Sequence, residues 1–205
     1  MELVGIFIVI IILLVSLVIH EVAHGLVAYW LGDDTAKTEG RLTLNPLAHV
    51  EPVLSIVIPV LCFITNSPII GGAKPVPVNY RKIKWHEWGV ALVALAGPLT
   101  NFILAFVAYG IFSILNISSG LLGGILLLFV NINLGLMLFN LLPLPPLDGS
   151  KIIFPIAPEF IQDIIQKMES NSLLVFFVII IFSNYISAGI QFVESYILTF
   201  FQWIF

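Results

Sequence analysis

Two histidines and a glutamate form a motif that could bind a metal ion inside an apolar segment. His20, Glu21 and His24 occur in the run V-I-H-E-V-A-H-G. On an α-helix, residues four apart lie on one face, so both imidazoles can bind a single Zn²⁺ while Glu21 lies beside them as a base. Zinc in hydrolytic sites usually has three protein ligands and leaves a fourth position to water. The motif therefore predicts a third ligand elsewhere in the chain.

Asp148 is the candidate for that third ligand. It follows three prolines in the run N-L-L-P-L-P-P-L-D-G, where the prolines favour an unwound backbone. It is also the only acidic residue between Glu87 and Glu159. Two structural alternatives remain: a pair of hydrogen-bonded core histidines, and an interfacial aspartate that caps the next segment. Ionisable groups are costly in apolar surroundings without a functional reason, which favours the metal site.

The composition indicates an integral membrane protein. The 205 residues are 60% hydrophobic and 10% charged, and the mean hydropathy is +1.10. Soluble domains are roughly 45–50% apolar and 25% charged. The length fits a single domain over residues 1–205, and the net charge of −4 includes no basic run suited to nucleic acid. The single cysteine, Cys62, can form no internal disulfide.

Apolar runs predict a polytopic α-helical protein with about four to six membrane segments. Leu3–Leu31 is long enough to cross a hydrocarbon core of roughly 30 Å. Pro158–Asn171 predicts a polar amphipathic helix, and Gln191–Phe205 is either an interfacial helix or a partial crossing. The other predicted spans are 86–115, 121–142 and 172–190.

Two segments between the first spans favour extended backbone. Leu42 and Leu44 alternate with polar residues, which predicts a short strand within Thr35–Pro46. Val53–Asn79 is interrupted by glycines and prolines, which predicts a small re-entrant element. Its last part, Gly71–Asn79, could offer an edge to an unwound substrate strand.

The segment from His49 to residue 84 gives three further expectations. In the edge segment, Val76 and Val78 would be the N–H donors, because the neighbouring prolines have none. His49 and Glu51 stand beside prolines and are expected in an interfacial loop. The basic residues of 74–84 mark the cytoplasmic side, so Val53–Asn79 must return to the side that it left if Asp148 is to reach the histidines.

The run A-L-A-G-P-L-T-N lies within the predicted helix 86–115. Gly97 allows a close approach between helices, and Asn101 can form a hydrogen bond across a helix interface. Packing is favoured over direct chemistry for both residues.

Together, H-E-V-A-H, A-G-P-L-T-N and N-L-L-P-L-P-P-L-D-G resemble the site-2 protease family of intramembrane zinc metalloproteases. The resemblance covers most of the chain. It implies that His20, His24 and Asp148 bind one Zn²⁺ per chain and that Glu21 is the catalytic glutamate. Asn140 would match the family asparagine that helps to hold substrate or the oxyanion. The sequence differs from that of some relatives in having no inserted PDZ module and no CBS pair, so the regulation that those domains provide is expected to be absent or to come from a separate protein.

The resemblance implies a multi-pass protein of the cell membrane that hydrolyses peptide bonds within or near transmembrane segments of other proteins. Its partners would be transmembrane substrates and the lipid bilayer. The alternatives are a non-hydrolytic zinc-binding membrane protein or carrier, and a structural scaffold. A carrier would need polar groups along a pathway, whereas here they gather at one depth; a scaffold leaves Glu21 and Asp148 unexplained.

Overall fold

The chain folds into a bundle that is nearly all helical. The computed structural model describes residues 2–49, 57, 60–61, 64, 74–117 and 120–205, and this part of the chain contains no β-strand. Its helices are α1 (Glu2–Trp30), α2 (Thr35–Thr38), η1 (Pro46–Ala48), η3 (Tyr80–Lys82), α4 (His86–Ile114), α5 (Gly120–Asn140), α6 (Asp148–Ile153), η4 (Phe154–Ile156), α7 (Glu159–Ser170), α8 (Ser172–Ile181) and α9 (Ser183–Ile204).

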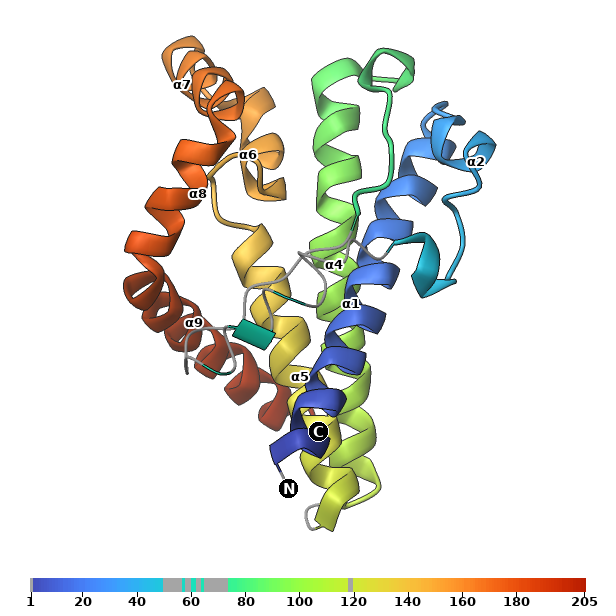
Figure 1. The fold of residues 1–205 in the computed structure, drawn as a ribbon, viewed down its shortest axis with the longest axis vertical. Coiled ribbons are helices and arrows are strands. Elements are labelled where there is room, and N and C mark those ends of the chain that lie inside the picture. Colours follow the sequence, from blue (N-terminus) through green and yellow to red (C-terminus); the bar gives the residue numbers. More distant parts are fainter. Residues whose placement is uncertain (1, 50–56, 58–59, 62–63, 65–73, 118–119) are drawn as a thin grey trace.

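Three helices form the centre of the bundle. In the described residues, only Val4–Trp30, His86–Ile114 and Gly120–Asn140 are long and apolar enough to cross a membrane. Helix α4 packs against both α1 and α5, and α9 packs against α5 (Figure 1). The predicted helical runs at 86–115 and 121–142 are therefore confirmed, and the three spans support a membrane protein. The larger number of four to six spans is not confirmed.

Packing between these helices uses small and branched side chains. Ala105 and Ala108 of α4, Leu134 of α5 and Phe201 of α9 belong to one buried cluster. Small residues let helix backbones approach closely, and van der Waals contact is the main source of helix association in lipid. The cluster fixes α4 and α5 side by side, which matters because both helices carry groups that reach the site.

The predicted strand around Leu42 and Leu44 is wrong. Residues 35–38 are helical instead, residues 42–43 form a bend, and residues 41, 44 and 45 have no regular structure. Local polar contacts replace a strand ladder: the Thr43 hydroxyl accepts the Asn45 N–H, and the Thr43 carbonyl accepts a bond from His49. Alternation alone cannot make a strand without a partner strand to pair with. Of the predicted re-entrant element Val53–Asn79, residues 74–79 have no regular structure, and most of the rest lies outside the described residues.

The C-terminal segment also differs from the expectation in one respect. The amphipathic helix at 158–171 is confirmed as α7. The span predicted at 172–190 is not confirmed, because α8 ends at Ile181 and a new helix begins at Ser183. Ten residues of α8 reach only about 15 Å, half of a hydrocarbon core. As Figure 1 shows, α7, α8 and α9 form an arc beside α5.

The end of α1 and the start of α4 are joined at the polar end of the bundle. The buried Asp33 carboxylate accepts the Asn79 N–H at 2.6 Å, and the Leu31 carbonyl accepts the Lys84 N–H at 2.9 Å. Lys82 and Asp34 form an exposed ion pair at 2.6 Å. The basic segment after residue 74 thus lies at the same end as the C-terminus of α1, as the topology expected from the sequence requires.

Candidate metal centre

His24 presents one ring nitrogen toward the interior of the bundle with its lone pair free. Its Nδ1 lies 2.7 Å from the Val93 carbonyl oxygen of α4. Because a carbonyl can only accept, Nδ1 must carry the proton. A neutral ring then has its lone pair on Nε2, which is the form that binds metals. The bond from His24 to the backbone of α4 therefore fixes both the tautomer and the orientation of the ring.

A chain of buried amides holds His20 in the same tautomer as His24, with the proton on Nδ1. Asn133 Nδ2 donates to the Phe129 carbonyl at 2.9 Å, which fixes the orientation of the Asn133 amide. Asn133 Oδ1 then accepts from Asn101 Nδ2 at 2.9 Å, so Asn101 Oδ1 faces His20 Nδ1 at 2.5 Å. His20 must donate there and leaves its Nε2 lone pair free. Asn133 also donates to Ser16, one turn before His20 on α1.

Asp148 completes a set of three donor atoms. Its Oδ2 lies 3.3 Å from His20 Nε2 and 3.4 Å from His24 Nε2, and the two Nε2 atoms are 3.0 Å apart. A tetrahedron with zinc–ligand bonds of about 2.0–2.1 Å has edges of about 3.3 Å. The three separations are close to that value, and two nitrogen lone pairs would otherwise face each other unfavourably. The donor set therefore fits a zinc ion with three protein ligands.

Glycines let the three elements approach this closely. A Cβ at Gly149 would overlap the carbonyl oxygens of Leu141 and Leu142, so the turn that brings Asp148 to the site requires glycine. A Cβ at Gly97 would lie 2.5 Å from Nε2 of both His20 and His24. The close approach predicted for Gly97 is confirmed, and its purpose is to make room for the two rings.

Gly97→Ala is expected to weaken zinc binding. The added methyl group must displace the ligand rings, and overpacking of this kind costs about 1–3 kcal/mol. Gly124→Ala is the matched control, because a Cβ at Gly124 meets nothing within 4 Å; alanine there gains up to about 1 kcal/mol of helix propensity. Zinc titration and thermal unfolding of both variants provide the test. Parent-like zinc affinity in Gly97→Ala would contradict the assignment of the rings as ligands.

Glu21 lies beside the donor atoms and is oriented by the backbone. Ligand atoms of His20, Glu21 and His24 lie within 4.8 Å of one another. Glu21 Oε2 accepts the Val76 N–H at 2.8 Å, which leaves the other carboxylate oxygen for a water molecule. The expectation that Val76 offers its N–H to substrate is therefore wrong, since that N–H is used by Glu21. Val78 keeps this possibility: no described residue accepts its N–H.

The donor atoms line a cavity of about 190 Å³, and other polar side chains line the same cavity. Asn140, at the end of α5, lines it and donates to the Leu136 carbonyl of its own helix. Lys151 is the only Lys or Arg among the described residues that line this cavity, and its Nζ lies 5.6 Å from the centre of the Tyr80 ring. Burial alone would lower the pKa of Lys151, but Tyr80 and Asp148 raise it, so the ammonium group stays charged.

Several residues that position the side chains of the metal centre were not predicted from the sequence. Ser16 and Asn133 could have been suspected, since Ser16 is four residues before His20 on the same helix face. The Val93 carbonyl has no sequence signal at all. His49 was expected in an interfacial loop but is fully buried, and its carbonyl accepts the Lys74 N–H next to the segment that orients Glu21. Glu51 lies outside the described residues.

Comparisons with known proteins identify relatives that are named as zinc metalloproteases. The chain is 43% identical over 178 residues to a Bacillus subtilis protein named "Putative zinc metalloprotease YwhC", covering 82% of this chain and 78% of that protein. The chain belongs to the same family as YwhC. It is also 34% identical over 157 residues to Rip2 of Mycolicibacterium smegmatis, which carries the same description, and spans 58% of that longer protein. No family model and no solved structure matches the chain. The name of YwhC agrees with zinc as the metal and with a metalloprotease.

Proposed function

We propose that this protein is an intramembrane zinc metalloprotease of the site-2 protease type, formed by a single domain over residues 1–205. Its substrates would be transmembrane proteins, cleaved within or near their membrane segments, and its place would be the cell membrane as a multi-pass protein. The observation that carries the proposal is the position of the three donor atoms, with separations of 3.0–3.4 Å beside the Glu21 carboxylate. The membership in the YwhC family supports it.

His20, His24 and Asp148 would hold one Zn²⁺ per chain. When bound, the ion supplies a Lewis acid that polarises the scissile carbonyl and activates water. The hydrogen bonds that His20 donates to Asn101 and His24 donates to the Val93 carbonyl keep both rings in the required tautomer before any ion arrives. The donor atoms are therefore arranged in advance, and little of the binding free energy is spent on reorienting side chains.

Glu21 would be the general base. The oxygen that does not accept the Val76 N–H takes the proton of the attacking water and delivers it to the leaving amine. Asn140, which lines the same cavity, would hold the substrate carbonyl or the developing oxyanion, and Val78 would offer its N–H to the unwound substrate strand. The substrate backbone must be extended at the cleaved bond, since a helix hides its carbonyls in internal hydrogen bonds.

Purified protein provides the test of this proposal. We expect about one zinc per chain, and cleavage of a single-span test protein in detergent at a bond that mass spectrometry places inside its apolar segment. His24→Ala and Asp148→Ala should lose both properties, while His86→Ala, an exposed histidine at the start of α4, should keep both.

A zinc carrier is the competing function. Zinc uptake into liposomes without any cleavage of test proteins would favour the carrier, and retention of full zinc affinity in Asp148→Ala would show that the third ligand is wrongly assigned.

A further inference from the structure

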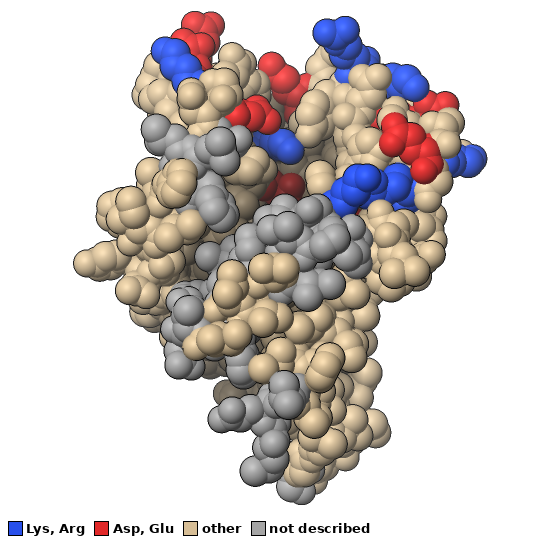
Figure 2. All heavy atoms as spheres, viewed as in Figure 1, with Lys and Arg blue, Asp and Glu red and all other residues tan. Residues whose placement is uncertain are grey.

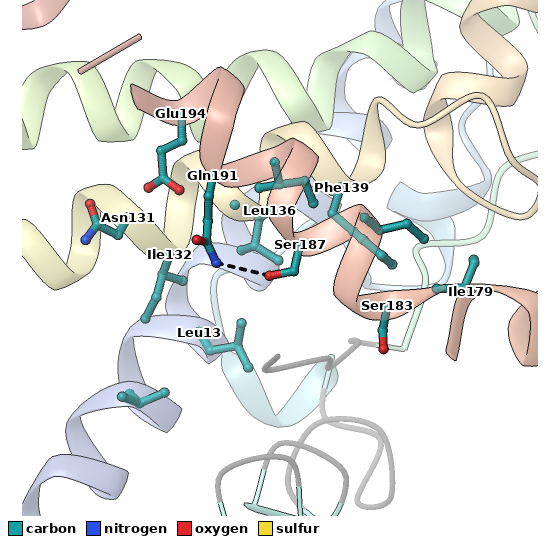
Figure 3. A pocket seen from close by; sticks show the side chains of 14 residues that line it. Leu13, Asn131, Ile132, Leu136, Phe139, Ile179, Ser183, Ser187, Gln191 and Glu194 are labelled. Atoms are coloured by element: carbon teal, nitrogen blue, oxygen red, sulfur yellow. Dashed lines mark hydrogen bonds between the residues drawn. The ribbon is translucent and has the colours of Figure 1, made fainter. Parts of the chain in front are cut away.

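A second cavity lies between α1, α5 and the α8–α9 arc. Its volume is about 310 Å³, and apolar side chains such as Leu13, Ile132 and Leu136 form most of its wall. Figure 3 shows the polar side chains Asn131, Gln191 and Glu194 together at one end of this groove, with Ile179 and Ser183 at the other end. The wall of the groove is thus mostly apolar, and its amide and carboxyl side chains lie together at one end.

The polar end lies at the depth of the membrane interior. Asn131 is the twelfth of the 21 residues of α5, one of the three candidate spans, and Glu194 lines the same cavity from α9. An ionisable group at this depth is costly unless it is paired, and such groups mark functional sites by default. The Glu194 side chain is partly buried, and its carboxylate has no hydrogen bond or ion pair to any described residue.

No basic side chain of this protein serves as the partner of Glu194. All eight Lys and Arg residues and all four His residues lie in the described part of the chain, and none pairs with Glu194. On the face shown in Figure 2, the Lys and Arg side chains lie in the upper half of the molecule, the end that carries α2 and α7. Any cation that pairs with Glu194 therefore comes from another molecule.

The groove and the cavity of the metal centre both lie against α5. Phe139 lines the groove, and the next residue of α5, Asn140, lines the cavity with the zinc donors. Asn131 and Asn140 are nine residues apart on α5, which corresponds to about 13 Å along the helix axis. A substrate helix that lies along α5 and reaches the level of Asn140 would therefore have a residue about nine positions away at the level of Asn131, at the end of the groove that holds Glu194.

We propose that this groove holds the substrate's transmembrane helix and that Glu194 selects substrates with a basic side chain about nine residues from the cleaved bond, on the side away from the polar end of the bundle. The apolar wall provides contact for the helix, and the carboxylate provides the specificity, because a segment without the basic residue leaves Glu194 unpaired. This inference rests on the proposed protease function, because it treats the bound helix as a substrate. Binding in the groove can nevertheless be measured without catalysis.

The test uses two synthetic membrane-spanning segments that differ at one residue. One carries Arg and the other Leu at the position nine residues from the bond that the parent cleaves. Binding is measured by energy transfer between labelled segments and the full-length Glu21→Gln protein in bicelles. We expect about 10-fold tighter binding of the Arg segment, the upper range for a polar contact between membrane helices. The preference should disappear in Glu194→Gln and persist in Glu159→Gln, an exposed glutamate of α7.

Charge reversal separates recognition from a structural effect. Glu194→Lys should prefer a segment with Glu at the same position, which a damaged groove could not do. Equal binding of the Arg and Leu segments, or a preference that survives in Glu194→Gln, would overturn the inference. Cleavage is scored separately with Glu21 intact: a binding preference without any cleavage would overturn the proposed protease function and leave the groove as a binding site.

Discussion

Glu21→Gln is expected to lower the cleavage rate by about 10²–10⁴-fold, the usual contribution of a general base, while zinc content stays at the level of the parent. Glutamine keeps an oxygen that can accept the Val76 N–H, so the neighbouring segment and the metal donors should not move. The loss should appear in kcat rather than in KM, because the missing proton transfer belongs to the transition state.

Glu39→Gln is the matched control for this variant, since Glu39 is exposed at the end of α2 and lies outside the cavity. Steady-state kinetics with a membrane-spanning substrate and metal analysis of the same preparations are sufficient. A Glu21→Gln protein with full activity would assign the base to another residue, and a protein without zinc would make Glu21 a ligand.

Asn101→Leu is expected to weaken zinc binding by about 10–100-fold, the range for loss of a partner that orients a metal-binding histidine. Leucine removes the acceptor for His20 Nδ1 and leaves the amide of Asn133 without its bond from Asn101. The ring of His20 can then rotate or change its tautomer, so that Nε2 no longer presents its lone pair toward His24 and Asp148.

Thr100→Val provides the comparison, because the Thr100 hydroxyl donates only to the Ala96 carbonyl of its own helix. Zinc affinity is measured by competition with a chelating dye, and the pH dependence of binding gives a second readout that a general loss of packing would not move. If Asn101→Leu binds zinc as the parent does, the orientation of His20 does not depend on the buried amides.

The candidate site shows where prediction from the sequence succeeds. A four-residue spacing on a helix places two histidines on one face by helix geometry alone, and the prolines before Asp148 interrupt a span at the only carboxylate available there. The structure brings these residues together, although zinc binding by them stays a prediction. Hydrophobic runs likewise predicted α1, α4 and α5, because a span through lipid must satisfy its backbone internally as a helix.

The extended and broken segments show where prediction from the sequence failed. The alternation around Leu42 and Leu44 favoured a strand, but a strand needs a partner that local sequence cannot supply. The apolar run after Ser172 favoured one span, yet α8 and α9 separate at Phe182 so that the chain bends around α5. Both outcomes depend on neighbours that are far away in the sequence.

The sequence by itself determined that this is a membrane protein, which helices are apolar enough to cross the membrane, and which residue types are available for chemistry. Each of these depends on composition or on spacing within one helix. Only the tertiary structure decided how those residues are held. The tautomer of His24 depends on a backbone carbonyl 69 positions away, that of His20 on an amide 81 positions away, and the orientation of Glu21 on an N–H 55 positions away. Hydrogen bonds between segments have no period in the sequence, because they arise from the packing of whole helices against one another.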